Sequence, residues 1–181
     1  MSSNYNYYKQ GHSQRRTLIF SVLAGVSLCV GLFGCSTVTT NQYAATARTV
    51  YTWQVHYYAY GTQKEDRIES FSSTSLLNRN GEKPEGAVTG PDDKGLWWPA
   101  LPARPTLDEL EQRQKPYEKA GTPELWQDVE YQISYLSGAQ TVTLPTNYDV
   151  YREVAKVYSS RPRLLLTLGI NNSSVEKAEP Q

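Results

Sequence analysis

The chain has 181 residues, with 18 basic and 18 acidic side chains. Lys9, Arg15 and Arg16 precede residue 17 and every acidic residue follows it, so the remainder holds 15 basic and 18 acidic residues, a net charge of about −3. Proteins that bind nucleic acid need a basic surface to neutralise phosphates, so this composition argues against a nucleic-acid partner.

Cysteine and histidine are too scarce for several kinds of site. The sequence holds two of each: Cys29 and Cys35 in or at the end of one apolar run, and His12 and His56 elsewhere. Thiolate zinc sites and Ser-His-Asp or Cys-His catalysis need more imidazole or thiol than this. We therefore expect no cofactor, no metal site and no catalytic residue of these classes.

Residues 1–34 form an export segment in outline. A polar stretch up to residue 14 is followed by the basic pair Arg15-Arg16 and by an apolar run from Leu18 to Phe33, the layout of a secretory signal. The basic pair also resembles a twin-arginine signal, which would imply folding before export. Alternatively, residues 17–34 could stay as a membrane span, since 18 helical residues cover about 27 Å of a bilayer core of about 30 Å.

The end of this run carries a more specific pattern. Leu32-Phe33-Gly34-Cys35 resembles the lipobox of bacterial lipoproteins, with an aliphatic residue at −3, a small residue at −1 and then the cysteine. The resemblance implies that Cys35 receives a diacylglyceryl group and that cleavage occurs after Gly34. Two or three acyl chains would anchor the domain stably to membrane lipid. It would then lie outside the cytoplasm, anchored to a cell membrane.

After Cys35 we expect a tether, a long strand and a turn. Residues 35–47 are small and polar, typical of a flexible tether, and a single domain is predicted over residues 48–170. Residues 49–60 predict a strand with Tyr51, Trp53, Val55, Tyr57 and Ala59 on one face. His56 falls on the mixed face, where a structural role is expected. A second strand is predicted over residues 67–77, followed by a tight turn at Asn80-Gly81.

Residues 82–95 are predicted to form a surface loop, whose pair Asp92-Asp93 lacks the alternating oxygen ligands of a calcium loop. The next stretch, Gly95 to Thr106, has prolines at every third position, the period of a polyproline II helix, and we call it the strap. It is either a recognition segment or a stiff connection whose tryptophans pack on their own sheet. The possible partner-binding residues are Trp97, Trp98, Pro99, Leu101, Pro102, Arg104 and Pro105.

The remaining elements complete an α+β pattern. Capping signals at Thr106, Thr122 and Thr146 each predict the start of a short helix. Strands are predicted over residues 129–135, 141–144 and 163–168, and a disordered polar tail over 171–181. The fold class is therefore α+β, with a mainly antiparallel sheet of about five strands and two or three short helices.

Three functional hypotheses remain. The strap and the Arg-Pro-Thr-Leu-Asp-Glu-Leu-Glu stretch that begins at Arg104 resemble a segment of uncharacterised cyanobacterial lipoproteins. This resemblance implies no activity, but it implies a lipid-anchored domain on a cell or thylakoid membrane, facing the periplasm or lumen. Our first hypothesis is a non-enzymatic, lipid-anchored accessory or assembly factor of a membrane complex. The second is a lipoprotein that binds a small molecule or glycan through aromatic surfaces. The third is a hydrolase that uses the carboxylates Glu124, Asp128 and Glu130.

Overall fold

The computed structural model describes residues 36–60 and 67–181. The chain divides into two units, residues 1–32 and 33–181, and all described residues belong to the second unit. Its elements are β1 (Thr37–Thr40), β2 (Tyr43–Ala59), β3 (Arg67–Arg79), α1 (Leu107–Arg113), β4 (Glu118–Ala120), β5 (Glu124–Ser137), β6 (Gln140–Thr146), α2 (Tyr148–Val157), β7 (Leu164–Leu168), the single 3-10 turn η1 (Ile170–Asn172) and β8 (Val175–Pro180).

One mixed sheet organises this unit. Its strand order is β1-β7-β8-β6-β5-β2-β3, and β4 pairs with the end of β2. All pairs are antiparallel except β6–β8, which share one parallel bridge between Thr146 and Val175. The α+β class and the mainly antiparallel sheet are thus confirmed, with eight strands in place of about five.

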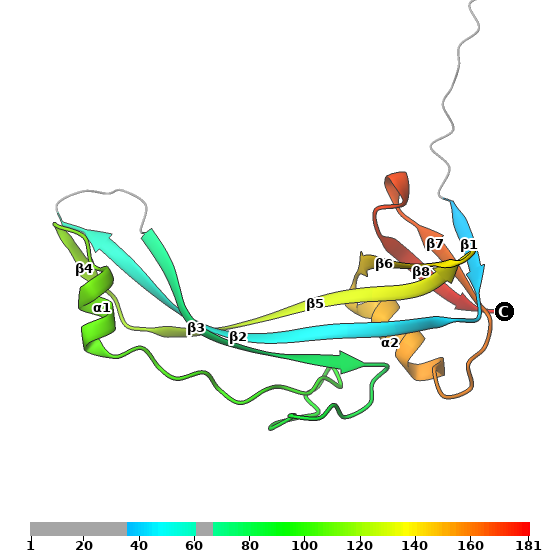
Figure 1. Cartoon of the computed structure of the whole chain (residues 1–181), viewed down its shortest axis with the longest axis horizontal. Coiled ribbons are helices and arrows are strands. Elements are labelled where there is room, and N and C mark those ends of the chain that lie inside the picture. The colour runs from blue at the N-terminus through cyan, green and yellow to red at the C-terminus, as the bar shows by residue number, and fades with distance from the viewer. Residues whose placement is uncertain (1–35, 61–66) are drawn as a thin grey trace, which may run out of the picture. The chain divides into compact units, whose positions relative to one another are not determined.

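β2 is the longest strand and links two separate cores. Near its start, Ala45 and Ala47 have no exposed surface and belong to a core that includes Ile133 and Val154. Small side chains at these positions let α2 lie close to β2 and β5. Near its end, Val55 and Tyr57 form a second core with Leu110 of α1, flanked by Phe71 and Ala120. Figure 1 shows β3 and β5 on either side of β2.

Several predicted elements are confirmed. The odd-numbered residues from Tyr51 to Tyr57 line the more buried face of β2, as the alternation predicted. Asn80 and Gly81 have φ angles of 53° and 75°, which suit a tight turn. Helix α1 begins after Thr106, whose hydroxyl accepts from the Glu109 N–H while the Glu109 carboxylate accepts from the Thr106 N–H. Helix α2 also forms, although its cap is Asn147, one residue after the predicted position.

Two predictions about the ends of the domain are wrong. Residues 36–47 are not a tether, because β1 pairs with β7 and β2 already begins at Tyr43. The tail over 171–181 is also wrong, because β8 pairs with β7 and buries Val175 and Ala178. Both segments are short and polar, so their own sequences do not predict a strand. Each is stabilised as a strand by pairing with β7.

The helix predicted after Thr122 is likewise absent, since Glu124 is the first residue of β5. Glu124 and Leu125 pair with Gln54 and Trp53 of β2. Two turns of isolated helix are marginal in water, so extending the ladder along β2 overrides the local start signal.

Candidate functional site

The strap is held against the sheet by side chains of β3. Asn78, Thr74 and Ser72 point to the same face of this strand and donate to the carbonyl oxygens of Trp97, Ala100 and Ala103, respectively. The acceptors recur every third residue, as the carbonyls along one edge of a polyproline II helix do. The three-residue period therefore matches the strap to a row of donors on its own sheet.

Several predicted partner-binding residues are packed inside this arrangement. Trp98 is buried, its ring lies 4.9 Å from the Tyr51 ring, and its indole N–H donates to Asp92 Oδ2 at 2.9 Å. Pro99 and Pro102 are buried as well, and Trp53 donates its indole N–H to the Pro102 carbonyl oxygen at 3.0 Å. These residues attach the strap to β2 and are not accessible to a partner.

The outer edge of the strap holds the remaining predicted residues. Leu101 is 62% exposed and Arg104 is exposed, with its guanidinium 5.5 Å from the centre of the Trp53 ring. Trp97 and Pro105 are half-buried. Any contact with a partner at the strap is therefore restricted to this edge.

The face of the sheet opposite the strap was not predicted as a binding surface. We call it the open face: the side chains at even positions of β2 between 46 and 58, with those of β3 and β5 on the same side. α2 and the strap lie on the other side of these strands, and no element in the described ranges covers the open face (Figure 1). It carries four of the large hydrophobic side chains that are exposed, namely Tyr58 (46%), Ile68 (51%), Leu77 (52%) and Trp126 (50%).

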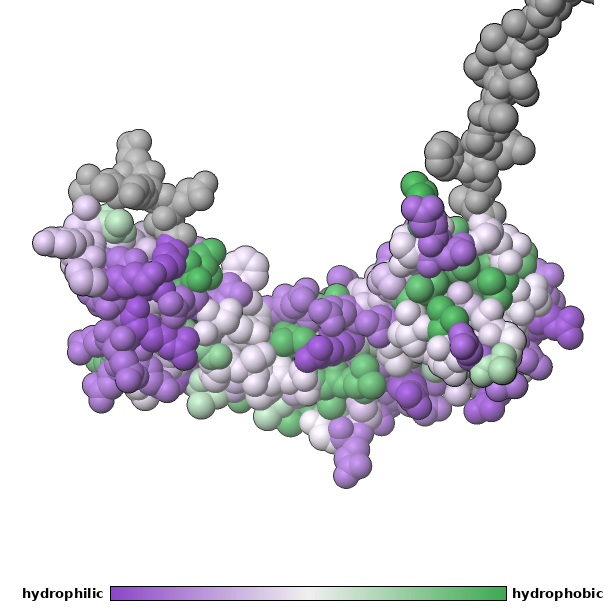
Figure 2. Space-filling view, turned by 45° about the horizontal axis from the view of Figure 1, so that its top comes forward, coloured by the Kyte–Doolittle hydropathy of each residue, from purple (hydrophilic) through white to green (hydrophobic). Residues whose placement is uncertain are grey.

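Strand register brings these residues to one face. Leu77 pairs with Arg48, Ile68 with His56, and Trp126 with Thr52. Directly opposed residues in an antiparallel pair have side chains on the same side of the sheet. Figure 2, which brings the upper side of Figure 1 forward, shows hydrophobic residues interspersed with hydrophilic ones on this side.

The polar side chains of the open face pair with one another across strands. Arg48 and Glu130 form an exposed ion pair at 3.8 Å, and the hydroxyls of Thr52 and Ser73 lie 2.9 Å apart. A non-obligate protein interface is about as apolar as the rest of a protein surface, and this face has the same mixture of hydrophobic and polar side chains. His56 lies on this face, as predicted, with its ring 6.3 Å from that of Tyr58 in a stacked arrangement.

The three carboxylates of the hydrolase hypothesis also lie on the open face. Glu124, Asp128 and Glu130 occupy even positions of β5 and are all exposed. The catalytic acid of a glycosidase typically lies in an apolar environment that raises its pKa, whereas these three carboxylates are exposed.

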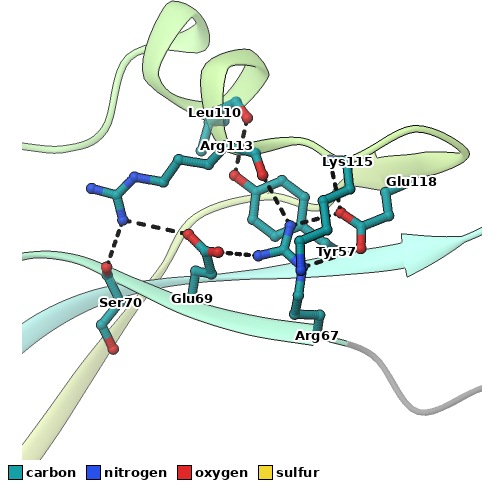
Figure 3. Close-up of polar contacts among 8 residues, drawn as sticks. All are labelled: Tyr57, Arg67, Glu69, Ser70, Leu110, Arg113, Lys115 and Glu118. Atoms are coloured by element: carbon teal, nitrogen blue, oxygen red, sulfur yellow. Dashed lines mark hydrogen bonds and ion pairs between the residues drawn. The ribbon is translucent and has the colours of Figure 1, made fainter.

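At the far end of β2, an ion-pair network fixes α1 to the sheet (Figure 3). Arg67 donates from Nε to Glu118 Oε1 at 3.1 Å and from Nη2 to Oε2 at 2.6 Å, a bidentate pair. The same guanidinium donates to Glu69 and to the Arg113 carbonyl oxygen, and lies 4.3 Å from the centre of the Tyr57 ring.

This network strongly lowers the pKa of one carboxyl group, that of Glu118. Hydrogen bonds from Arg67, and secondarily from the Lys115 N–H, lower the pKa of the Glu118 carboxyl to about 2 against the opposing effect of burial. Arg113 completes the attachment by donating to the Ser70 carbonyl oxygen at 2.8 Å. The network thus stabilises the charged form of Glu118 and positions α1.

Beside this network lies an open groove of about 720 Å³ between α1 and the β4–β5 connection. Its apolar part is formed by Leu107, Leu110 and Pro123, and Glu111 and Glu124 contribute charge. Tyr58 lines the groove and also belongs to the open face, so the two features adjoin.

Asp92, which the sequence analysis placed beside Asp93 in a loop, has a structural role. Its Oδ1 accepts from the N–H groups of Lys94 and Leu96, both at 2.9 Å, while Oδ2 accepts from Trp98. Both carboxylate oxygens therefore hold the loop that leads into the strap. Across residues 36–60 and 67–181, no group of three or more His, Cys, Asp or Glu side chains is placed to hold a metal ion.

The predicted lipidation residue Cys35 and its motif Leu32, Phe33 and Gly34 lie outside the described residues. The neighbouring Ser36 is described: its carbonyl oxygen accepts from the Leu168 N–H at 2.8 Å. None of the helices in the described part of the chain could cross a bilayer, since the longest, α2, has ten residues.

Comparisons with known proteins add no family to this description: no family model, no curated protein and no solved structure matches the chain significantly.

Proposed function

We propose that this chain is a membrane-anchored extracytoplasmic lipoprotein that serves as a non-enzymatic accessory or assembly factor and binds a membrane protein through its open face. The observation that carries the proposal is the spacing between the lipobox-like motif and the fold. Cys35 ends the motif, and β1 begins at Thr37. An acylated Cys35 would therefore hold the folded domain directly at the bilayer surface.

The position of the open face supports a partner in the same membrane. In Figure 1 the start of β1 lies on one side of the β2–β5 ribbon, and α2 and the strap lie on the other. The open face is the uncovered side, and so it is directed to the side from which the chain enters the domain. A domain held at the lipid surface would present this face, with its exposed Leu77 and Trp126, to proteins in that membrane.

Metabolic labelling tests the anchor. With radiolabelled palmitate, the chain and a Cys29→Ser variant should incorporate label, whereas Cys35→Ser should not. Cys29 is the matched control because it is the other cysteine of the sequence. Label that persists in Cys35→Ser would overturn the lipoprotein assignment.

Site-specific photo-crosslinking in native membranes tests the partner surface. A crosslinking residue at Leu77, on the open face, is compared with one at Val88, which is 64% exposed in the loop before the strap. We expect a discrete adduct with an integral membrane protein from position 77 only, lost when Trp126→Ala is added. Equal adducts from both positions, or none from position 77, would overturn this part of the proposal.

A second candidate function rests on Trp126. Its side chain is half-exposed on the sheet face beside Thr52, with the carboxylates of Glu124 and Asp128 at the adjacent even positions of β5. An exposed aromatic ring beside hydrogen-bonding groups is a surface on which a sugar ring can stack, as in a glycan-binding protein. Thermal shifts with oligosaccharides distinguish the two functions: a shift that is lost in Trp126→Ala and kept in Leu77→Ser would favour glycan binding.

A further inference from the structure

The loop that contains η1 lies beside the point at which the chain enters the domain. The Ser36 carbonyl oxygen accepts from Leu168, directly before this loop, and the Ser36 hydroxyl donates to the Asn172 side chain within it. Cys35 directly precedes Ser36 in the chain. The attachment point and η1 therefore form one end of the domain.

At this end, Ile170 is directed into solvent. It is 74% exposed, and the residues that follow it in the turn are polar. Asn171 and Asn172 have φ angles of 55° and 57°, a conformation that asparagine tolerates better than most residues, and the Ile170 carbonyl oxygen accepts from Ser173 Oγ at 2.8 Å. The backbone of the turn is thus fixed independently of the isoleucine side chain.

Few side chains at this end carry a charge. Residues 36–47 and residues 164–175 contain no Asp, Glu, Lys or Arg. Glu176, directly after the second segment, is charged, and its carboxylate accepts from the Ser174 hydroxyl at 2.5 Å. A single exposed hydrophobic residue is common on any protein, so it is the position of Ile170 beside Ser36, the first described residue after Cys35, that is informative.

We propose that η1 is a membrane-contact element and that the Ile170 side chain inserts into the headgroup and acyl boundary of the bilayer that holds Cys35. This inference rests on the proposed function in one respect, that the chain before Ser36 is in the membrane. It applies equally if residues 17–34 remain as a span. Insertion would add a second contact to the anchor and so limit rotation of the domain about the lipid.

A depth measurement tests the contact in the full-length chain in liposomes. In a Cys29→Ser background, Ile170→Cys is labelled with an environment-sensitive fluorophore and compared with Val88→Cys, a similarly exposed site in the loop before the strap. Lipids that carry a nitroxide on the acyl chain should quench position 170 at least about threefold more than position 88, because an interfacial side chain reaches about 5–10 Å into the boundary. Equal quenching at the two positions would overturn the inference.

The parent with Cys29→Ser alone separates failure of the inference from failure of the proposed function. An acylated Cys35 has no free thiol, so this parent should take up no fluorophore. Labelling of the parent contradicts acylation, and the comparison of positions 170 and 88 is then made with Cys35→Ser added. An unlabelled parent with equal quenching contradicts only the contact. A chain that does not bind liposomes contradicts both.

Discussion

The side-chain amide of Asn78 pairs with the backbone of Trp97 in both directions. Its Oδ1 accepts from the Trp97 N–H at 2.8 Å, and its Nδ2 donates to the Trp97 carbonyl oxygen at 3.0 Å. Asn78 is 1% exposed and also donates to the Ala47 carbonyl oxygen at 3.2 Å. One buried amide therefore joins the strap to β2 and β3, and it decides where the strap begins to follow the sheet.

Replacing Asn78 should destabilise the domain substantially. Asn78→Asp keeps the shape but turns a carboxylate oxygen toward the Trp97 carbonyl, so we expect a loss of about 2–4 kcal/mol in the free energy of unfolding. The measurement is urea denaturation of the detergent-solubilised chain. Ser75→Ala, at an exposed position of the same strand, is the control and should cost under about 0.5 kcal/mol. Equal midpoints for the two variants would contradict the role assigned to Asn78.

Asp92 and Asp93 offer a matched pair for the loop before the strap. In Asp92→Asn, the amide N–H₂ would face one of the N–H groups from which the Asp92 carboxylate accepts a hydrogen bond. We therefore expect a loss of about 1–3 kcal/mol in the free energy of unfolding. Asp93→Asn removes the same charge one residue later at an exposed position and should be nearly neutral. The same denaturation experiment compares them, and a larger effect from Asp93→Asn would refute the structural role of Asp92.

The Glu118 carboxyl predicts a pH dependence with a definite sign. Its pKa is about 2 in the folded state, below the ordinary value of 4.5, so its stabilising contribution is complete above about pH 4.5 and is lost as the pH falls toward 2. Between these limits the free energy of unfolding should fall more steeply for the parent chain than for Glu118→Gln. Hydrogen bonds from Thr106 lower the pKa of Glu109 as well. The stability of Glu118→Gln should therefore still fall with pH, but less steeply than that of the parent.

Glu111→Gln provides the control for this experiment, since Glu111 is an exposed carboxylate on α1, the helix that the network attaches to the sheet. Its stability curve should keep the slope of the parent. Identical slopes for the parent and Glu118→Gln between pH 2 and 4.5 would show that Arg67 does not stabilise the charged form of Glu118.

Strand β8 should be essential for the stability of the domain, although its polar sequence is typical of a disordered tail. Val175 is 1% exposed and belongs to the main core, so Val175→Ala should cost about 1–3 kcal/mol. Lys177→Ala removes an exposed ion pair with Glu179 and should cost under about 1 kcal/mol. Thermal unfolding monitored by circular dichroism measures both, and a Val175→Ala variant as stable as the parent would contradict the placement of β8.

The elements that could be predicted from the sequence are those whose signals are local. The alternation of Tyr51, Val55 and Tyr57 marks the buried face of β2, the capping box at Thr106 marks α1, and Asn80-Gly81 marks a turn with positive φ angles. Each of these patterns is complete within a few residues. They therefore depend little on distant parts of the chain, in contrast to the start signal at Thr122, which the pairing of β5 with β2 overrides.

What could not be predicted depends on distant partners. β1 and β8 are short and polar, and each is stabilised by β7. Asparagine is common in turns, so the sequence does not indicate that Asn78 is buried. The strap residue that it binds, Trp97, is 19 positions further along the chain. The open face was missed because Leu77 and Ile68 of β3 and Trp126 of β5 lie on two different strands, and only the register of these strands with β2 brings them to one side. The register shift between Thr52 and Gln54 places the odd-numbered Leu77 and the even-numbered Ile68 of β3 on the same side.

The central claim is that Cys35 is an acylated amino terminus that holds the folded domain at the membrane. Intact mass spectrometry of the protein extracted from its native membrane measures this directly. We predict the mass of a chain that begins at Cys35 and carries a diacylglyceryl group, with or without a third acyl chain. A mass that corresponds to an unmodified chain, whether it begins at Met1 or after a cleavage at another residue, would contradict the claim.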